Sequence, residues 1–348
     1  MQTTPTPPIG NTKIRLLFLI FAILAFCTAG CFSMPPAEKR CERTAVIFGT
    51  VVRLSAMGDT AEIAVAECLD QLDALDRLFG ADDPSAPLAK LRDAAGTGEW
   101  VAMPPKLWHI LHLSQSYSAQ TDGAWDITVG ALSAIWKKSL VDGVPPSGEA
   151  VLTAREKIGW KKLDLRASDK SARLAEAGMS LDLGGVRKGF ALDECRRIYA
   201  KHHVTGLIDL GESSIAAIGE TASGEPFRIA LRHPRQESPA RLGVLLMKDA
   251  ALSTSGDYEH FFIADGARYH HILDTRTGFP AKSGVASVFV RIGAEEPDAG
   301  LISDMLSTAF FVLGTEKSLA LLPSLPVRAE AVFADETGVA AGENFLRE

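Results

Sequence analysis

From residue 179 onward the chain consists of short runs of apolar and β-branched residues separated by brief turns. Two of the runs, HFFIA and RYHHIL, are separated only by Asp265, Gly266 and Ala267, which is typical of a hairpin. Strands with such short connections pair antiparallel, because a parallel pair needs a long crossover. The pattern predicts an α+β fold with mixed, largely antiparallel sheets and packed helices, and not a doubly wound parallel sheet. The predicted strands are MSLDL (179–183), GLIDL (206–210), SIAAIG (214–219), FRIAL (227–231), LGVLLMK (242–248), HFFIA (260–264), RYHHIL (268–273), VASVFVRI (285–292) and VRAEAVFA (327–334).

The first half of the chain carries helical patterns beside one predicted strand. Residues 44–54 (TAVIFGTVVRL) are rich in β-branched side chains and predict that strand. The apolar residues that follow recur every three or four positions and predict an amphipathic helix that ends at Gly80. A further helix is predicted after Pro104 and Pro105. The expected buried stripe of the first helix is Ile63, Ala66, Leu69, Leu72, Leu75 and Phe79.

An apolar run near the N-terminus departs from globular composition. Lys13 and Arg15 precede LLFLIFAILAFCTAGC, which turns into small residues immediately before Cys31. This layout predicts a secretory signal peptide over residues 1–30. The alternative is a single transmembrane anchor, which needs about 20 apolar residues. The tetrapeptide TAGC resembles a bacterial lipobox, and this implies that Cys31 becomes the lipidated first residue of the mature protein.

The lipobox resemblance also implies where the protein resides. Residues 31–43 contain Pro35 and Pro36 among mixed charges and predict a tether between the lipid and the domain. The domain itself is predicted over residues 44–348. We therefore expect a protein of the cell envelope that is anchored through its lipid to a bacterial membrane, on the periplasmic or extracytoplasmic face.

Charge and cysteine content exclude several classes of function. The net charge is −7 and no stretch is dense in Lys and Arg, so nucleic-acid binding is not expected. Of the five cysteines, Cys41, Cys68 and Cys195 lie beyond the signal segment and have no C-x-x-C spacing. They predict packing residues and neither a disulfide framework nor a zinc site.

The segment SLDLGGVRKGFALDECRRIYAKHH combines a short strand, a glycine turn and a helix. The predicted strand ends at Asp182, Gly184 and Gly185 form the turn, and the helix begins near Lys188. Free backbone N–H groups, the positive end of the helix dipole and a lysine then meet at one point, which suits a phosphate. The spacing matches neither nucleotide fingerprint. The alternative is a plain connection in which the glycines only reverse the chain.

A second chemical signal lies in ISDMLSTAFFVLG, a predicted apolar helix that ends at Gly314. Asp304 and Thr308 are four residues apart and share one face of this helix. A carboxylate and a hydroxyl are ligands that suit a hard divalent ion such as Mg²⁺. The alternative is that Asp304 only complements the positive end of the helix while Thr308 packs.

Two further stretches offer contacts for a ligand. In DGAWDITVGALSAIW, Trp125 and Asp126 precede a predicted helix, and the indole either covers an aromatic ligand or belongs to the core. In STSGDYEHFF, Ser255 and Gly256 stand at the end of a predicted strand, where a glycine permits close approach of the backbone to a ligand.

His270 and His271 stand side by side in YHHILDTRTGFP, between a strand-like run and a polar turn. Neighbouring side chains on a strand point to opposite faces, so at most one of the two can face a given pocket. The turn adds Asp274, Thr275 and Thr277 as polar contacts. By itself, such a histidine pair is more often structural or on the surface than catalytic, and it does not decide the function.

Together these stretches resemble the ApbE family, the flavin transferases that cleave FAD and attach its FMN half to a protein. The shared segments are DITVGALSAIW, DLGGVRKGFALD, STSGDYEHFF, YHHILDTRTGFP and DMLSTAFFVLG, and the resemblance runs from about residue 44 to the C-terminus. The chain departs from the family pattern at Arg187 (usually Ala), at Glu212 and Ser213 (usually Gly and an apolar or small residue) and at Arg92 (usually Asn). None of these departures removes a presumed ligand side chain.

The resemblance implies an ApbE/T-fold-like arrangement with FAD in a cleft between sub-lobes. It also implies Mg²⁺ held by Asp304, Thr308 and a main-chain carbonyl of the glycine turn, which we place at Gly185. Lys188 would then stand beside the diphosphate and stabilise the charge that develops there. The implied FAD contacts are Trp125, Asp126, Asp182, Gly184, Gly185, Lys188, Ser255, Gly256, His271, Ile272 and Asp274.

The reaction implied by the resemblance is attack of a Thr or Ser hydroxyl of an acceptor protein on FAD, which leaves phosphoester-linked FMN and releases AMP. The hydroxyl needs a base, and His271 and Asp257 are both candidates, with His271 expected on the phosphate side. Expected acceptors are flavin subunits of membrane electron-transfer complexes. Two alternatives stay open: hydrolysis of FAD to FMN and AMP, and flavin binding without catalysis by a lipid-anchored protein.

Overall fold

The computed structural model describes residues 39–80, 83–236, 240–338 and 340–341. The predicted signal peptide, Cys31 and the tether up to residue 38 lie outside the described residues. Within the described part of the chain, no helix is long and apolar enough to span a membrane.

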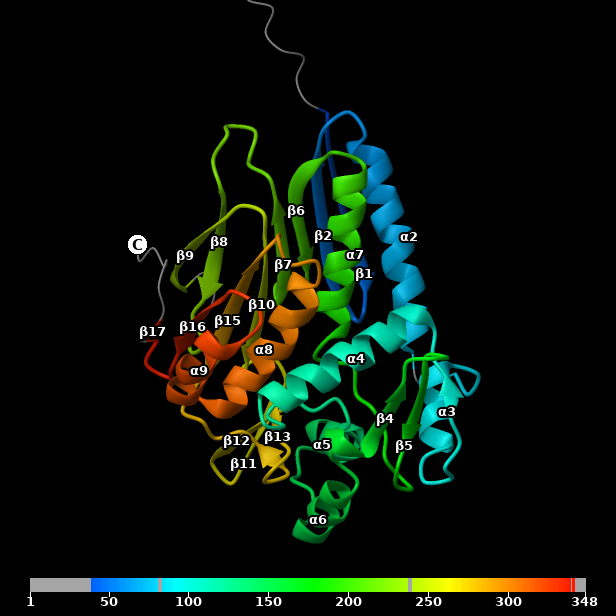
Figure 1. Cartoon of the computed structure of the whole chain (residues 1–348). Coiled ribbons are helices and arrows are strands. Elements are labelled where there is room, and N and C mark those ends of the chain that lie inside the picture. Colours follow the sequence, from blue (N-terminus) through cyan, green and yellow to red (C-terminus); the bar gives the residue numbers. More distant parts are fainter. Residues whose placement is uncertain (1–38, 81–82, 237–239, 339, 342–348) are drawn as a thin grey trace, which may run out of the picture. The chain divides into compact units, whose positions relative to one another are not determined.

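An eight-stranded sheet organises the described chain, with strand order β1-β2-β6-β7-β10-β15-β16-β17 (Figure 1). Each neighbouring pair in this sheet is antiparallel. The predicted α+β class with largely antiparallel pairing is therefore confirmed. The strands of this sheet are β1 (Arg40–Ile47), β2 (Thr50–Met57), β6 (Thr205–Leu210), β7 (Ser214–Ile218), β10 (Ala250–Gly256), β15 (Ser287–Gly293), β16 (Ala329–Ala334) and β17 (Ala340–Ala341).

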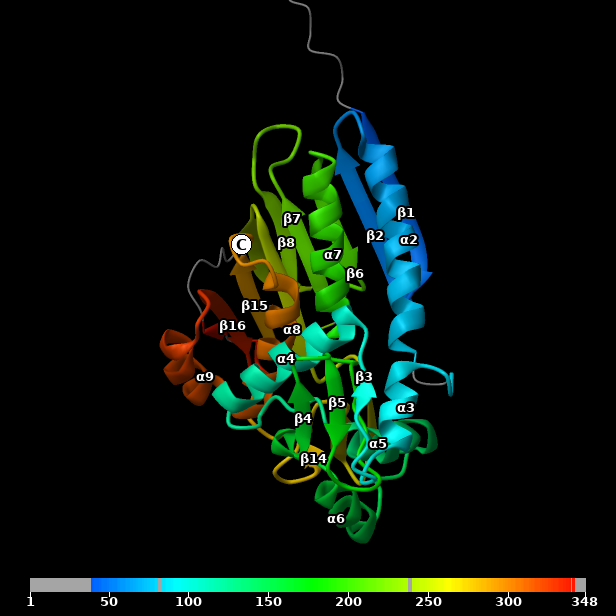
Figure 2. The ribbon, with the colours of Figure 1, turned by 45° about the vertical axis from the view of Figure 1, so that its right-hand side comes forward.

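Three helices lie along one face of the large sheet: α2 (Ala61–Phe79), α7 (Arg187–Lys201) and α8 (Ala299–Leu313) (Figures 1 and 2). On the opposite face, the hairpin of β8 (Phe227–Arg232) and β9 (Arg241–Met247) packs on apolar side chains of β7, β10, β15 and β16. Strand β10 is therefore buried on both faces. Its alternating side chains send serines toward α8 and apolar groups toward the hairpin.

The remaining elements form a second region beside the ends of α7 and α8 (Figure 2). A small sheet of order β3-β5-β4 lies near the long helix α4. Buried side chains of α5 and α6 join residues of β11 and β13 in one apolar cluster. The elements are α3 (Pro87–Asp93), β3 (Val101–Ala102), α4 (Pro105–Gln120), α5 (Gly130–Asp142), α6 (Gly148–Glu156), the 3-10 turn η1 (Trp160–Lys162), β4 (Leu163–Arg166), β5 (Ser171–Leu174), β11 (Phe261–Ala264), β12 (Ala267–His270), β13 (Leu273–Asp274) and β14 (Phe279–Pro280). After α8 follow α9 (Thr315–Leu321) and the 3-10 turn η2 (Leu322–Ser324).

The predicted strand at 44–54 is wrong as a single element, because the chain reverses within it. Phe48 and Gly49 have φ angles of 56° and 71°, and they form the tight turn between β1 and β2. Two consecutive positive φ angles match the two-residue hairpin turn whose twist suits paired strands. In addition, β1 begins at Arg40, so residues 40–43 belong to the sheet and not to the predicted tether.

The buried face of α2 also differs from the predicted stripe. Ile63 is 59% exposed and Ala66 is exposed, whereas Ala64 and Cys68 are fully buried. Small side chains line the inner face because α2 packs closely against α7 and β1. The prediction is therefore wrong for Ile63 and Ala66 in the N-terminal half of the helix. Leu72, Leu75 and Phe79 in the C-terminal half are buried as predicted.

The predicted strand MSLDL is also wrong. Only a single parallel bridge between Ser180 and Val129 forms there, and residues 181–183 lead directly into the glycine turn. The backbone of this segment is instead joined to the chain before α5, since the Asp182 N–H donates to the Ile127 carbonyl over 2.9 Å. The three cysteines of the described chain are buried and free, as predicted.

Candidate functional site

Asp304 lies at the crossing of α7 and α8 and is 7% exposed. Its Oδ2 atom accepts the backbone N–H of Gly189 over 2.6 Å, and its Oδ1 atom accepts the Ser214 hydroxyl over 3.0 Å. Burial raises the pKa of Asp304 above its ordinary value, and the nearby Lys188 and the hydrogen bonds oppose that rise. The carboxylate is thus held by the start of α7, by β7 and by its own helix.

The crossing depends on two glycines, Gly189 and Gly300. A Cβ atom on Gly189 would collide with the Gly300 carbonyl oxygen, and a Cβ atom on Gly300 would lie 2.5 Å from the Gly189 carbonyl oxygen. Only glycine fits at such a distance. This close approach is what brings the Gly189 N–H within reach of Asp304, one turn along α8.

The twin-glycine turn lies against Thr308 and Trp125. A Cβ atom placed on Gly185 would be 3.5 Å from the Thr308 Oγ1 atom and 3.0 Å from the six-membered ring of Trp125. The Ser255 hydroxyl lies 3.4 Å from that same Oγ1 atom. Gly185 and Thr308, predicted from separate motifs, are therefore brought together, and Trp125 is buried beside them.

Lys188 is half-buried on the first turn of α7, and its Nζ atom donates to the Ser213 hydroxyl. Removal from water lowers the pKa of Lys188, and the negative charge of Asp304 works against that decrease. The ammonium group thus faces the same region as the Asp304 carboxylate, where it can neutralise an anionic ligand.

The donors gathered here are oxygens: a carboxylate, hydroxyls and the carbonyl groups of the glycine turn. Within the described residues no group of three or more His, Cys, Asp and Glu side chains could hold a metal. A set of donors made only of oxygen atoms does not suit zinc, which prefers nitrogen and sulfur ligands. It does fit Mg²⁺, which is commonly held by one or two carboxylates together with water and substrate phosphate.

His270 and His271 differ in exposure: His270 is buried at the end of β12, and His271 is exposed in the bend that follows. His270 is buried, its Nε2 atom donates to the Ala281 carbonyl over 3.1 Å, and its Nδ1 atom accepts the Ile272 N–H over 3.3 Å. Its ring also meets Phe311 edge-on, with 5.4 Å between the centroids. Burial lowers the pKa of His270. This histidine is therefore a structural residue that locks the turn after β12.

His271 lies in the bend after β12 and is exposed. Its backbone N–H donates to the His260 carbonyl over 3.0 Å, and the two imidazole rings lie 5.3 Å apart in an edge-on arrangement. Although solvent reaches the side chain, protein atoms crowd around it. The partial loss of water and the neighbouring His260 and His270 lower the pKa of His271 to about 4, and Lys188 adds to that effect. His271 is therefore neutral near pH 7.

Asp257, the second candidate base, is held in an ion pair. Both of its carboxylate oxygens accept the guanidinium of Arg235, each over 2.7 Å. The Asp257 side chain is 9% exposed and that of Arg235 is 22% exposed. In this two-pronged arrangement both carboxylate oxygens are committed to the guanidinium. The structure therefore gives Asp257 a structural role and leaves His271 as the better candidate.

Asp126 was predicted as an FAD contact, and its carboxylate is engaged within the protein. It accepts the N–H and the hydroxyl of Thr128 over 2.8 and 2.6 Å, and the Trp160 N–H over 2.9 Å. Burial raises the pKa of Asp126. These bonds fix the start of α5 to the 3-10 turn η1, so Asp126 positions Trp125 rather than presenting a free oxygen.

Asp182 and Asp274, also predicted as FAD contacts, each pair with a cation. Asp182 accepts Lys137 Nζ over 2.8 Å and the Gly184 N–H over 2.7 Å, which shapes the glycine turn. Burial opposes ionisation of Asp182, but Lys137 and these bonds hold its pKa below the ordinary value. Asp274 pairs with Arg276 over 2.8 and 2.9 Å within its own turn.

Comparison with known proteins decides the family. The profile of the ApbE family matches residues 48–333. The chain belongs to the ApbE family. It is 31% identical over 333 residues to a Treponema pallidum protein named FAD:protein FMN transferase, with 90% of each chain covered. An Escherichia coli K12 protein of the same name is 28% identical over 323 residues, with 89% of each chain covered.

Solved structures agree with that assignment. The ApbE protein of Thermotoga maritima superimposes with a TM-score of 0.79 and 28% identity, covering 89% of this chain and 100% of that one. The apo form of the Pseudomonas stutzeri flavinyl transferase ApbE gives a TM-score of 0.73 and 26% identity, covering 88% and 95%. The fold is therefore that of ApbE proteins over nearly the whole described chain.

Two departures from the ApbE pattern now have a structural account. Arg187 donates to the Phe48 carbonyl over 3.0 Å and stacks on the Phe48 ring, so its charge is directed toward the β1–β2 turn. Glu212 has a φ angle of 61°, a conformation that favours glycine, and its carboxylate lies 3.6 Å from Arg53. Neither side chain occupies the space between Gly185 and Thr308.

Several residues that shape this ApbE site were not predicted. Ser214 holds Asp304, and the hydroxyls of Ser253 and Ser303 meet over 2.8 Å between β10 and α8. Ser307, which was likewise not predicted, meets the predicted FAD contact Ser255 over 2.9 Å. The signal was present in the spacing, because Ser253 and Ser255 are two apart on a strand and therefore share one face. Their helical partners, four residues apart, share a face as well.

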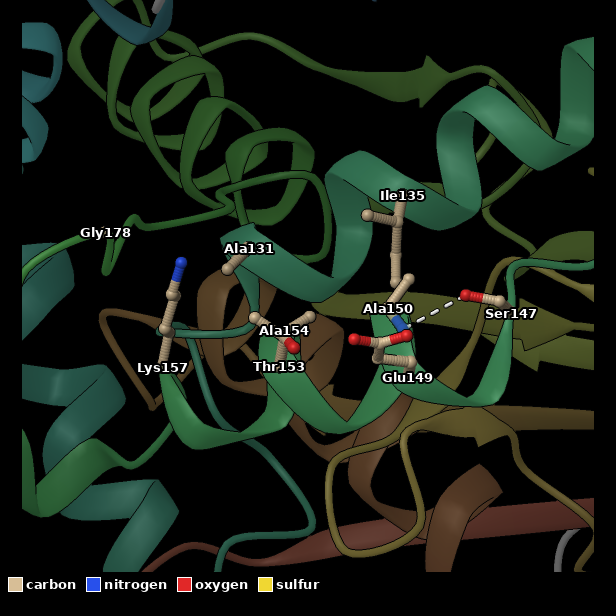
Figure 3. A pocket seen from close by; sticks show the side chains of 9 residues that line it. All are labelled: Ala131, Ile135, Ser147, Glu149, Ala150, Thr153, Ala154, Lys157 and Gly178. Carbon is tan, nitrogen blue, oxygen red and sulfur yellow. Dashed lines mark hydrogen bonds between the residues drawn. The ribbon is translucent and has the colours of Figure 1, made fainter.

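Two surface hollows lie away from these residues. One, of about 430 Å³, is formed between α5 and α6 and is bordered by Ile135, Glu149 and Lys157 (Figure 3). The other, of about 650 Å³, lies over the outer face of β1, β2 and β6. Neither hollow is lined by a residue predicted for the site, so the FAD cleft between sub-lobes stays a prediction.

Proposed function

We propose that this protein transfers FMN from FAD to a Thr or Ser hydroxyl of an acceptor protein and releases AMP, in a reaction that depends on Mg²⁺. Relatives that span the chain are named FAD:protein FMN transferase. The structural observation that carries the proposal is the meeting of Gly185, Thr308, Asp304 and Lys188 at one place. These groups come from two separate motifs: Gly185 and Lys188 belong to the glycine turn and the start of α7, and Asp304 and Thr308 belong to α8.

Asp304 and Thr308, with a carbonyl of the glycine turn at Gly185, are the residues proposed to hold Mg²⁺. Both Asp304 oxygens already accept one hydrogen bond and retain a further lone pair each. The ion would supply charge neutralisation on the diphosphate oxygens while the bond to AMP breaks. Lys188 would contribute a second positive charge from the start of α7, where the helix dipole also favours an anion.

His271 is the proposed general base. Because its pKa lies near 4, the imidazole is neutral near pH 7 and has a free nitrogen to accept the proton of the acceptor hydroxyl. The hydroxyl oxygen then forms a bond to the FMN phosphorus, and the bond from that phosphorus to the bridging oxygen breaks. AMP leaves with the bridging oxygen, and the proton stays on His271. The exposure of this side chain suits a substrate that is itself a protein.

Trp125, Ser255, Gly256 and Ile272 are proposed to line the FAD site together with the glycine turn. At Gly256 the space that a side chain would fill is taken by the Tyr258 ring, so the need for glycine there is met within the protein. The carboxylates of Asp126, Asp182 and Asp274 support the site indirectly, by holding Trp125, the glycine turn and the turn after β13 in place.

The sequence further supports a proposal about location. Signal-like residues 1–30 and Cys31 in a lipobox-like setting would place the enzyme in the cell envelope, anchored by lipid to a bacterial membrane. Flavin subunits of membrane electron-transfer complexes are the proposed acceptors. A lipid tether would hold the enzyme beside them.

The test is to incubate the purified protein with FAD, Mg²⁺ and a candidate flavin subunit and then to weigh the subunit by mass spectrometry. A mass increase of one FMN with equimolar AMP is the expected outcome. Free FMN and AMP without an adduct would establish a hydrolase instead, and bound, intact FAD would establish a flavin-binding protein. Removing Mg²⁺ with a chelator is expected to stop transfer, and an unchanged rate would contradict the proposed role of the metal.

A further inference from the structure

Asp193 is a buried carboxylate that the proposed chemistry does not use. It lies on α7, its side chain is 0% exposed, and burial raises its pKa to about 6 despite the nearby Arg196. Its Oδ1 atom accepts the Gly300 N–H and its Oδ2 atom accepts the Leu301 N–H, both over 2.8 Å. These two donors belong to the first turn of α8, where backbone N–H groups have no partner within the helix.

The same two helices are joined at a second point by Asp304 and Gly189. Asp193 lies four residues after Gly189 on α7, and Asp304 lies four residues after Gly300 on α8. One helical turn of each helix therefore separates the two joints. At one joint, α7 supplies the carboxylate and α8 the N–H groups, and at the other joint the roles are reversed. Between the joints, Gly189 and Gly300 leave no space for a side chain.

We propose that Asp193 is a positioning residue that sets the place of the Asp304 carboxylate by anchoring the first turn of α8. This inference rests on the proposed function in one respect: the role of Asp304 as a ligand of Mg²⁺ is part of that proposal. A helix is stiff over one turn. Fixing the Gly300 and Leu301 N–H groups therefore fixes the direction in which the Asp304 side chain points from the helix. Without the anchor, α8 can shift along the glycine contact and Asp304 loses its bond to the Gly189 N–H.

The test compares Asp193→Asn with Tyr199→Phe in the full chain. The asparagine variant keeps the shape of the side chain but loses one acceptor oxygen and the negative charge. The control removes another buried hydrogen bond of α7, from the Tyr199 hydroxyl to the Ser55 carbonyl over 3.2 Å, at a position that does not touch the start of α8. Two readouts are needed: amide hydrogen exchange at Gly189 without metal, and Mg²⁺ affinity by calorimetry.

In Asp193→Asn, hydrogen exchange at the Gly189 amide is expected to accelerate at least tenfold more than exchange at the central amides of α7. The affinity for Mg²⁺ is expected to fall by roughly 10-fold to 100-fold, which is the usual effect of losing a group that orients a metal ligand. Tyr199→Phe is expected to leave both values within about threefold of wild type, whatever its melting temperature. If Asp193→Asn leaves Gly189 protected, or if both variants change Gly189 equally, the positioning role is overturned.

The two hypotheses fail separately. If the unaltered protein binds no Mg²⁺, the proposed metal is wrong, while metal-free exchange at Gly189 still decides whether Asp193 positions Asp304. Should Asp193→Asn not accumulate as folded protein, Asp193→Glu carries the same test, because it keeps the buried charge and displaces the carboxylate by one methylene. Faster exchange at Gly189 in that variant supports the anchor, and wild-type protection overturns it.

Discussion

The crossing of α7 and α8 and the base of the β11–β12 hairpin, both used by the proposed reaction, differ in exposure and in hydrogen bonding. At the crossing, Asp304 is 7% exposed and each of its oxygens has a donor from a different element. At the hairpin, His260 and His271 are exposed, and their mutual contact is one backbone hydrogen bond and one ring contact. The crossing is buried and its carboxylate is hydrogen-bonded within the protein, whereas the histidines at the hairpin are open to solvent.

This contrast indicates how the two regions would share the proposed reaction. Groups that stabilise developing charge act best when they are already fixed and withdrawn from water, since no reorganisation is then needed during reaction. A group that takes a proton from another protein has to be reachable from solvent. The crossing therefore suits the charge of the diphosphate, and the hairpin suits the arrival of the acceptor. Substitutions at four positions test this division.

The largest effect is expected for Asp304→Ala, which removes the only carboxylate at the crossing proposed to hold the metal. Transfer of FMN should fall by about 10³-fold, the scale of losing a preorganised electrostatic group. The isosteric Asp304→Asn should be equally inactive, because it keeps the shape and loses the charge. The measurement is the rate of acceptor mass gain, with circular dichroism to verify the fold. Full activity in a folded variant would refute the metal assignment.

His271→Gln should reduce transfer by about 10² to 10⁴-fold, the usual contribution of a general base. The unaltered enzyme should show a flat rate above about pH 5 and lose activity as pH falls through about 4, because protonation removes the accepting nitrogen. An unperturbed histidine would instead lose activity near its ordinary pKa of 6.5. The acidic decline should be absent from the residual rate of His271→Gln, and a decline that persists there would assign the base to another group.

Asp257→Asn separates the two candidate bases. Because Asp257 forms a two-pronged pair with Arg235, its loss should cost stability of about 1–3 kcal/mol, as expected when a hydrogen-bonded charge loses its partner. The transfer rate at a temperature well below unfolding should stay within about threefold of wild type. Thermal unfolding and initial rates measure the two effects. A large loss of rate without loss of stability would restore Asp257 as the base.

The smallest effect is expected for Arg187→Ala, at a position where ApbE proteins usually carry alanine. Its guanidinium is bound to the Phe48 carbonyl and ring, so the loss should lower stability by less than about 1 kcal/mol and change the KM for FAD less than about threefold. Steady-state rates at varied FAD concentration test this. A tenfold rise in the KM for FAD would show that Arg187 contacts the substrate. The substrate site at the helix crossing would then include Arg187 as well as Asp304.

Prediction from the sequence succeeded where one local pattern decides the outcome. The helix after the glycine turn begins next to Lys188 as predicted, since α7 runs from Arg187 to Lys201. Most strands after residue 200 lie close to their predicted positions, since alternation and turn residues are local signals. The errors fall at MSLDL, at residues 44–54 and at RYHHIL, which was predicted as one strand. RYHHIL is divided by a bend at His271 into β12 and the start of β13, and these two strands have different partners.

For the site, the sequence supplied the residue types and the tertiary structure supplied their partners. Spacing alone placed Asp304 and Thr308 on one helical face and the twin glycines at the start of another helix, because helical periodicity is a local property of the chain. Whether these two elements meet depends on Gly189 and Gly300, which are 111 positions apart in the sequence and allow the helices to cross. Tertiary packing likewise decided which carboxylates are left free to contact a ligand. Asp257 is bound by Arg235, and Asp126 is bound by Thr128 and Trp160. Spacing in the sequence does not reveal these donors, because they come from other parts of the fold.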